Sequence, residues 1–122
     1  MTTAYWCVLI AGLLPYLATS IAKGGARFDN NDPRAWLSRQ TGWRARAHSA
    51  QQNSFEAFPL FAAAVLVAHQ TGAAQAHVDM LAVAFVGARL AYLAAYIANL
   101  ALLRTLVWMI GMALVIAIFC SH

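Results

Sequence analysis

Long stretches without charged side chains dominate this 122-residue sequence. No Asp, Glu, Lys, Arg or His lies between Met1 and Lys23, and none lies between Thr105 and Ser121. One helical crossing of a bilayer core needs about 20 predominantly apolar residues. Charged residues make up only 10% of the chain, against roughly 25% in ordinary soluble domains. The sequence therefore predicts an integral membrane protein with a single domain.

Charge and turn signals divide the apolar sequence into four segments. No strong turn signal separates the last two, but one helix over residues 80–120 would be about 60 Å long, twice the bilayer core. We therefore expect the chain to fold back near Asn99 to Arg104. The predicted fold is all-α, an integral membrane four-helix bundle, left-handed and antiparallel. Its helices are expected over about residues 4–22, 47–70, 77–99 and 104–120.

The basic residues predict an orientation in the membrane. Six of the eight Lys and Arg residues lie between Lys23 and Arg46, in the first connection, and Arg104 lies at the third. Because cytoplasmic loops carry the excess of Lys and Arg, we expect the first and third connections in the cytosol and both termini outside the inner (cell) membrane. The net charge of +4 then reflects contact with anionic membrane lipid and not nucleic-acid binding.

Neither the cysteines nor the histidines form a pattern for metal binding. The four histidines show no ligand spacing, so we expect no metal site. Cys7 and Cys120 stand at the outer ends of the first and last predicted helices. A disulfide between them is one alternative, and two buried thiols is the expectation that we favour.

Glu56 and Arg89 are charged residues inside predicted membrane helices. A charge near mid-bilayer costs about 3 kcal/mol or more, and such residues usually face a bundle interior or a wet cavity. Each of the two lies about ten residues, or about 15 Å, from the same membrane surface, so their depths are similar. One interpretation is a structural ion pair that holds the helices together.

Polar neighbours favour a second interpretation, a ligand site. An amide lies three residues before Glu56, and two phenols follow Arg89 at i+3 and i+7, so each set shares one helix face. An acid, an amide, phenols and guanidinium groups suit a small zwitterionic, polyanionic molecule and not lipid tails. Taken singly, each of these neighbours is typical of packing, interfacial anchoring or an interhelical hydrogen bond. The set is Asn53 and Glu56, then Arg89, Tyr92 and Tyr96, then Arg104.

Two stretches resemble the signatures of the MAPEG family, the membrane-associated proteins in eicosanoid and glutathione metabolism. The first is Arg46–Phe61, in which Asn53 and Glu56 stand three apart just before a Phe-Pro step and follow basic residues. The second is Arg89–Tyr96, which is followed by Arg104. The resemblance covers nearly the whole chain, including the basic first connection and the expected helix count.

The resemblance implies a homotrimer of four-helix subunits, with glutathione bound as co-substrate between neighbouring subunits near the cytosolic side. It implies that Arg104 faces the sulfur as the catalytic residue and favours the thiolate, since a fixed positive charge at a helix N-terminus lowers thiol pKa values. The thiolate would attack a lipophilic electrophile or reduce a hydroperoxide. Glu56 would hold the glutathione amino group. The other implied binding residues are Gln51 and Asn53 on its backbone, Arg46 and Arg89 at its carboxylates or bracing Glu56, and Tyr92 and Tyr96 along the pocket.

Two positions depart from the family pattern. Ser49 stands where several members carry an arginine, and Ala57 stands where some carry an aromatic residue. The missing arginine removes one carboxylate anchor, which Arg46, Lys23 or Arg27 would have to replace. These departures favour an alternative function, a catalytically silent trimeric binding or scaffold protein. A third alternative is a small multidrug transporter, but transporters of that class generally carry their membrane carboxylate on the first helix, and here the first helix has none.

Overall fold

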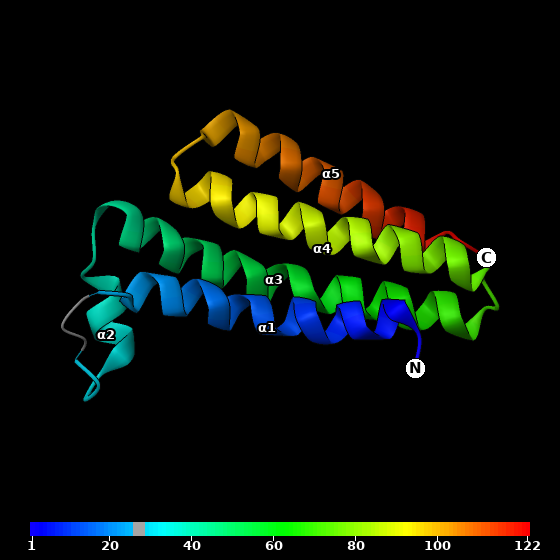
Figure 1. The fold of residues 1–122 in the computed structure, drawn as a ribbon, viewed down its shortest axis with the longest axis horizontal. Coiled ribbons are helices and arrows are strands. Elements are labelled where there is room, and N and C mark those ends of the chain that lie inside the picture. The colour runs from blue at the N-terminus through cyan, green and yellow to red at the C-terminus, as the bar shows by residue number, and fades with distance from the viewer. Residues whose placement is uncertain (26–28) are drawn as a thin grey trace.

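The structure, a computed structural model, describes residues 1–25 and 29–122 and is all-helical over them. Four of its helices are long and one is short. The long helices lie side by side in Figure 1, with the chain direction reversing from each to the next, and the short helix lies at the left end. The predicted all-α class is confirmed. In chain order the elements are α1 (Thr3–Lys23), α2 (Pro33–Ser38), α3 (Gly42–Gln70), α4 (Gln75–Ile97) and α5 (Ala101–Phe119).

Two features of the helix boundaries differ from the sequence prediction. Helix α3 begins at Gly42 and not near residue 47, because its polar first turns continue the helix beyond the apolar run. The short helix α2 was not predicted. Its start has a recognisable signal, since the Asp32 side chain accepts a hydrogen bond from Ala35 N at 3.2 Å and Pro33 occupies the first helical position, as is typical of helix N-termini.

The turn between α4 and α5 lies where the chain was expected to fold back. Helix α4 ends at Ile97 and α5 begins at Ala101. Between them Asn99 adopts a left-handed conformation, with φ of 62°, which asparagine tolerates better than most residues. As a result Arg104 lies in the first turn of α5, next to the backbone N–H groups that a helix N-terminus leaves without helical partners.

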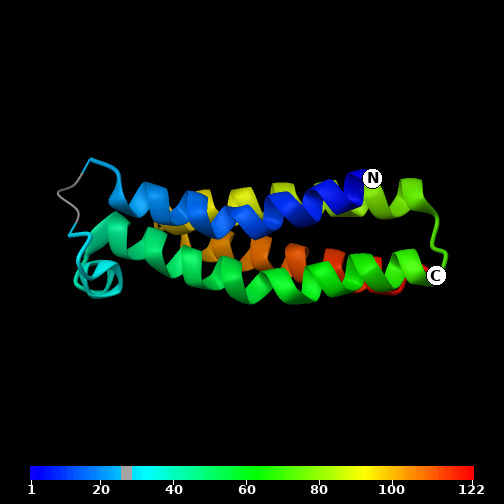
Figure 2. The ribbon, with the colours of Figure 1, turned by 90° about the horizontal axis from the view of Figure 1, so that it is seen from below.

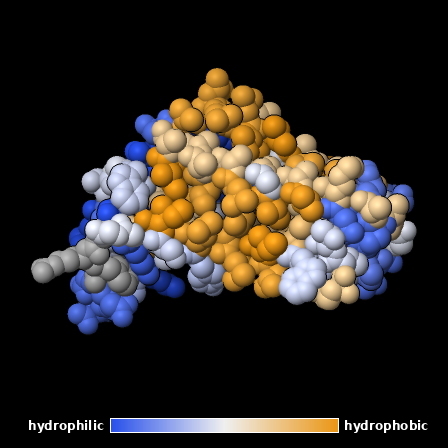
Figure 3. Space-filling model, viewed as in Figure 1, coloured by the Kyte–Doolittle hydropathy of each residue, from blue (hydrophilic) through white to orange (hydrophobic). Residues whose placement is uncertain are grey.

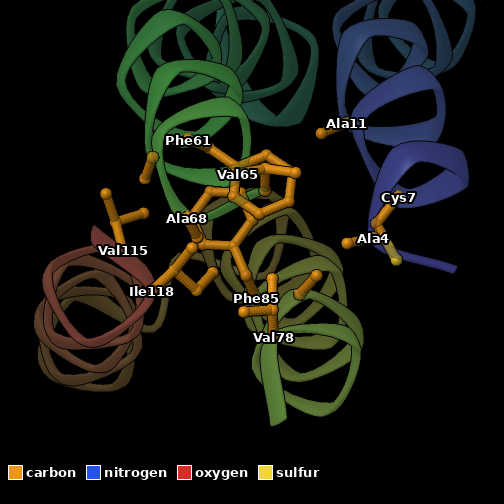
Figure 4. Packing of buried hydrophobic residues seen from close by; sticks show 12 residues of the cluster. Ala4, Cys7, Ala11, Phe61, Val65, Ala68, Val78, Phe85, Val115 and Ile118 are labelled. Atoms are coloured by element: carbon orange, nitrogen blue, oxygen red, sulfur yellow. The ribbon is translucent and has the colours of Figure 1, made fainter. Parts of the chain in front are cut away.

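Helices α3 and α4 form the centre of the molecule, with α1 packed on one side and α5 on the other. Figure 2 shows α1 and α3 running along each other, with α4 and α5 behind them. The largest core lies in the half of the molecule near the termini. There the rings of Phe61 and Phe85 stack at a centroid distance of 4.1 Å and an angle of 14°, with Val65 and Ile118 packed around them (Figure 4).

Three of the described helices, α1, α4 and α5, are long and apolar enough to cross a membrane. In Figure 3 apolar residues cover the middle of the visible face and polar residues gather at both ends. Helix α3 is not among them, and uncharged polar residues such as Gln52 and Asn53, as well as Glu56, lie within its length. Four crossings therefore remain an expectation, and three candidate crossings are shown.

The first and third connections lie at one end of the molecule, here called the basic end, and both termini lie at the other (Figure 1). Two arginines of the basic end join helices together. Arg44 Nη1 donates to the backbone oxygen of Ala22 at 2.9 Å, and Arg46 Nε donates to that of Ile97 at 3.0 Å. The first turns of α3 thus supply hydrogen-bond donors to the carboxyl ends of α1 and α4, where helix carbonyls lack partners. Arg27 lies outside the described residues.

At the end that carries the termini, a carboxylate on α4 joins this helix to the start of α1. Oδ1 of Asp79 on α4 accepts hydrogen bonds from the backbone N–H of Ala4 at 2.8 Å and from Gln75 Nε2 at 2.6 Å. Both cysteines are free thiols, so no disulfide joins α1 to α5. Cys7 is buried, as expected, whereas Cys120 is exposed, which corrects the expectation of two buried thiols.

Candidate functional site

Arg89 is a buried guanidinium in the half of the molecule towards the basic end, with only 5% of its surface exposed. Its Nη2 donates to Asn53 Oδ1 at 2.7 Å and to Ser54 Oγ at 3.4 Å. A buried charge needs hydrogen-bond partners, and here an amide and a hydroxyl supply them. The structural ion pair with Glu56, one of the two interpretations of the sequence, is not formed among the described residues, and Arg89 instead fixes the position of Asn53.

Glu56 has a different environment from Arg89. Its side chain is exposed on α3, one turn beyond Asn53. Over residues 1–25 and 29–122 it has no hydrogen-bond or ion-pair partner. Because a carboxylate at this depth would face lipid or a partner molecule, Glu56 is the group in this region with the strongest need for a ligand.

Alternating cationic and aromatic side chains connect α4 to α5. The guanidinium carbon of Arg89 lies 4.3 Å from the ring centre of Tyr92, and that of Arg104 lies 4.5 Å from the ring centre of Tyr96. The two rings meet edge to face, with centroids 5.7 Å apart. Each cation–π contact is worth about 0.5–2 kcal/mol. Together they fix Arg104 beside the two tyrosines.

These residues border a hollow between α3, α4 and α5, here called the polar cleft. It consists of two adjoining hollows that share Asn53 and Trp108. The first is also lined by Tyr92, Arg104 and Thr105, and the second by Glu56, Ala57 and Met112. Sequence reasoning brought together four of these residues and missed Thr105 and Trp108. Trp108 could have been found, because it lies one helical turn after Arg104 on the same face.

A second, mainly apolar hollow, here called the apolar cavity, continues from the polar cleft towards the core. Its volume is about 60 Å³, and it shares Glu56, Ala57, Trp108 and Met112 with the cleft. Arg89 forms part of its wall. The remaining lining is Leu60, Phe85, Gly111 and Val115.

Two residues of the predicted site lie elsewhere in the subunit, and a third, Tyr96, contacts Arg104 without lining the polar cleft. Arg46 is bonded to the end of α4 through its Nε and does not line the polar cleft. Gln51 lies on another side of α3, where its Oε1 accepts a hydrogen bond from His48 Nδ1 at 3.1 Å. It borders a separate hollow together with Arg34 and Ser38. One subunit therefore does not present Gln51 and Asn53 to the same ligand.

No group of three or more metal-ligating side chains exists in the described part of the chain. The side chains that line the polar cleft include an acid, an amide, a phenol and a guanidinium at a helix N-terminus. A carboxylate and a guanidinium together have the charges that complement a zwitterion.

The family model for the MAPEG family matches residues 3–121. The chain belongs to the MAPEG family. No curated protein and no solved structure matches it. As a MAPEG member with three candidate membrane spans it is a membrane protein of the glutathione and eicosanoid metabolism family. The match gives no support to the multidrug-transporter alternative.

Proposed function

We propose that this MAPEG protein is a membrane glutathione-dependent transferase or peroxidase and that the polar cleft is its glutathione site. The observation that carries the proposal is the exposed, unpartnered carboxylate of Glu56 on the same cleft as Asn53, Tyr92 and Arg104. Glutathione supplies an amino group for the carboxylate, amide groups for Asn53 and a thiol for Arg104. A cleft that served only for helix packing would have no need of an unpaired acid.

In this proposal Asn53 and Glu56 contact glutathione, and Arg89 holds Asn53 in position. Because Asn53 Oδ1 accepts from Arg89, its Nδ2 is the group left to donate to a glutathione carbonyl. Glu56, one turn further along α3, binds the ammonium group in a charge-assisted hydrogen bond. Arg89 thus acts on the ligand through Asn53, and Glu56 acts on it directly.

Arg104 has the placement required to activate the thiol. An ordinary thiol has a pKa of about 8.5 and is only slightly ionised at neutral pH. A guanidinium in the first turn of α5 adds a full charge to the positive end of the helix dipole, which favours the thiolate once the thiol proton has passed to water. The sulfur then forms a bond to an electrophilic carbon, whose leaving group departs with the bonding electron pair.

The peroxidase reaction uses the same thiolate. Its sulfur attacks the O–O bond of a hydroperoxide, which breaks to give an alcohol, after proton uptake, and glutathione sulfenic acid. A second glutathione then reduces the sulfenic acid to the disulfide and water. Both reactions need one ionised sulfur beside Arg104, and both use lipophilic substrates that concentrate in the bilayer.

We include in the proposal a homotrimer in which glutathione lies between subunits, with α3 as a fourth crossing and the basic end in the cytosol. Gln51 and Asn53 lie on different sides of one α3, so the two can meet one glutathione only if Gln51 comes from the neighbouring subunit. The exposure of Glu56 in the isolated subunit is consistent with a neighbour covering this region.

The thiolate is the direct test of the proposal. Ultraviolet difference absorbance of the purified protein should show a thiolate signal on addition of glutathione, and Arg104→Ala should remove it while glutathione still binds. Glu56→Gln should weaken binding without removing the signal at saturation. If the parent protein binds no glutathione although it elutes as an intact oligomer, the proposal is wrong.

A catalytically silent trimeric binding or scaffold protein is the second candidate. It is favoured by the position of Arg46, whose Nε is bonded to Ile97, because an arginine tied to α4 is poorly placed to replace the one that relatives carry at the position of Ser49. This candidate predicts a stable oligomer with no thiolate signal at any glutathione concentration.

A further inference from the structure

The turn between α4 and α5 carries large apolar side chains at the basic end. Leu100, Leu102 and Leu103 are 51%, 75% and 48% exposed, and with their neighbours in the turn they border an open hollow. The sequence has no charged residue between Arg89 and Arg104. An exposed apolar patch of this kind marks an interaction surface, so the turn requires an apolar environment outside the described subunit.

The first connection, at the same end of the molecule, has the opposite character. It exposes charged side chains, among them Asp32, Arg34 and Arg39. Its large apolar residues Trp36 and Leu37 are buried against residues of α1 and α3. Segments in contact with water expose their charged side chains and bury their large apolar ones. The first connection therefore suits an aqueous environment, and the α4–α5 turn does not.

The two connections also lie at different levels along the molecule. In Figure 1 the α4–α5 turn does not extend as far towards the left end as α2 or the start of α3. The last residue of α4, Ile97, accepts a hydrogen bond from Arg46, and α3 begins at Gly42, so α3 extends about 6 Å beyond Arg46. Since α1, α4 and α5 are the candidate membrane spans, the turn lies closer to the membrane centre than the first connection.

The backbone of the turn fits the boundary between lipid chains and headgroups. Leu100 N donates to Ala95 O at 2.9 Å, and Asn99 N donates to Tyr96 O at 3.1 Å, so part of the turn needs no acceptor from water. The first N–H groups of α5 lack helical partners, and Leu100 at the helix start provides no side-chain cap. Unpaired donors are costly in hydrocarbon, whereas water and the oxygens of lipid headgroups can accept from them.

We infer that the α4–α5 turn is inserted into the bilayer, with its leucine side chains among the phospholipid acyl chains and its backbone at headgroup level. The first connection lies in water at the same side of the membrane. The partner of the leucine patch is therefore phospholipid and not a second copy of the chain or another protein. This placement does not depend on a glutathione site.

Continuity with α5 favours lipid as the partner. Leu102, Leu106 and Ile110 follow one another at intervals of four residues, so they share one helix face, and all three are exposed. Helix α5 is a candidate membrane span, and its outer apolar face continues into the turn without a polar residue on this line. One lipid-facing surface therefore includes both the span and the turn.

Spin labels in lipid nanodiscs of phosphatidylcholine and phosphatidylglycerol test the depth of the turn. The labels are attached at Leu102→Cys in the turn, at Ser38→Cys in the first connection and at Ile110→Cys within α5. Both native cysteines are replaced, by Cys7→Ala and Cys120→Ser. The measured quantity is the ratio of collision rates with oxygen, which concentrates in lipid, and with a water-soluble nickel chelate.

The ratio at position 102 should be severalfold higher than at 38 and lower than at 110. A ratio at 102 equal to that at 38 would place the turn in water and overturn the inference. Low collision rates with both reagents at 102 would show that protein covers the patch, and would overturn it as well. A ratio as high as at 110 would contradict the placement at headgroup level.

A charge in the turn provides a second test in the same nanodiscs. Leu102→Glu should lower Tm by several degrees, because a carboxylate at this depth is costly, and the matched control Ser38→Glu should leave Tm unchanged. The oligomer should elute as the parent does in both variants. Equal Tm values for the two variants contradict the insertion of the turn, and dissociation of the oligomer by Leu102→Glu identifies a second copy as the partner instead.

Discussion

The half of the molecule near the termini and the half near the basic end contain the same four long helices but use them differently. Near the termini, Phe61, Phe85 and Ile118 form a continuous apolar core. Towards the basic end the buried clusters are smaller, and the centre is occupied by Arg89 with its amide and hydroxyl partners. The half near the termini stabilises the fold through its apolar core. The half near the basic end is less closely packed and contains the polar cleft.

The comparison teaches that a membrane protein can place polar chemistry between helices only where other contacts hold them together. In lipid, helix association depends on close packing and hydrogen bonds and not on removal of apolar surface from water. The stacked phenylalanines supply packing in one half. In the other half, the cation–π contact of Arg104 with Tyr96 joins α5 to α4, and the hydrogen bonds of Arg89 to Asn53 and Ser54 join α4 to α3. Variants in the two halves should therefore have separable effects.

The largest effect is expected from Phe61→Ala. It removes the ring that stacks on Phe85 and leaves a cavity in the main core. In a soluble protein, such a change loses both the transfer of the ring out of water and its packing contacts. In lipid mainly the packing contacts are lost, so we expect destabilisation by about 3 kcal/mol, at the low end of the usual range. Thermal unfolding in detergent measures it. Glutathione affinity of the folded protein should stay unchanged, and a parallel loss would show that the two halves are coupled.

Asn53→Leu is expected to come next. It leaves the buried guanidinium of Arg89 with Ser54 as its remaining partner in the described structure. The loss of a hydrogen bond to a charged group costs about 2 kcal/mol. Unlike Phe61→Ala, this change should reduce both stability and glutathione binding. The neighbouring, exposed Gln52→Leu is the control, and equal effects of the two variants would remove the special role of Asn53.

Glu56→Gln should affect function alone. The carboxylate has no hydrogen-bond or ion-pair partner in the described part of the chain, so stability should not fall. The glutathione dissociation constant should rise about tenfold, because a neutral amide replaces one member of a charge-assisted hydrogen bond. Calorimetric titration measures the change. An unaltered constant would place the amino group of glutathione elsewhere.

Asp79→Ala should have the smallest effect and should fall in the half near the termini. It removes the acceptor for the Ala4 N–H group and for Gln75. Loss of a side-chain acceptor at a helix N-terminus costs about 1 kcal/mol. Unfolding in mixed detergent micelles should show this loss with turnover unchanged. A loss of turnover as large as that of Glu56→Gln would contradict the separation of the two halves.

Much of the fold could be predicted because charge gaps mark apolar helices directly. The gap before Lys23 coincides with α1, and the gap after Arg104 coincides with most of α5. The early start of α3 at Gly42 could not be predicted in this way, because polar residues outside the apolar run are equally compatible with a loop. The Asp32-Pro33 pair begins α2, but Asp-Pro pairs are equally common in turns, so the pair alone does not predict a helix.

The site was predicted in part for a similar reason. Helical spacing correctly grouped Asn53 with Glu56. The same geometry separates Gln51 from Asn53 by about 200° around the helix, so their placement on different sides followed from the sequence. The bond of Arg46 to Ile97 depends on two helices meeting, and no local pattern contains that information. Similar depths in the membrane did not show that Arg89 bonds to Asn53 and Ser54 and not to Glu56, because depth does not define which helix faces meet.

The position of the polar cleft between helices, in the half near the basic end, has a kinetic consequence for the proposed function. The peptide reactant would arrive from water at the basic end, and the oily reactant would arrive sideways from the bilayer. Since neither crosses the path of the other, saturating one should not inhibit entry of the other, and initial-rate plots should show random-order addition without substrate inhibition. The reaction rate would then depend on the concentration of the lipophilic substrate in the lipid and not on its concentration in the buffer.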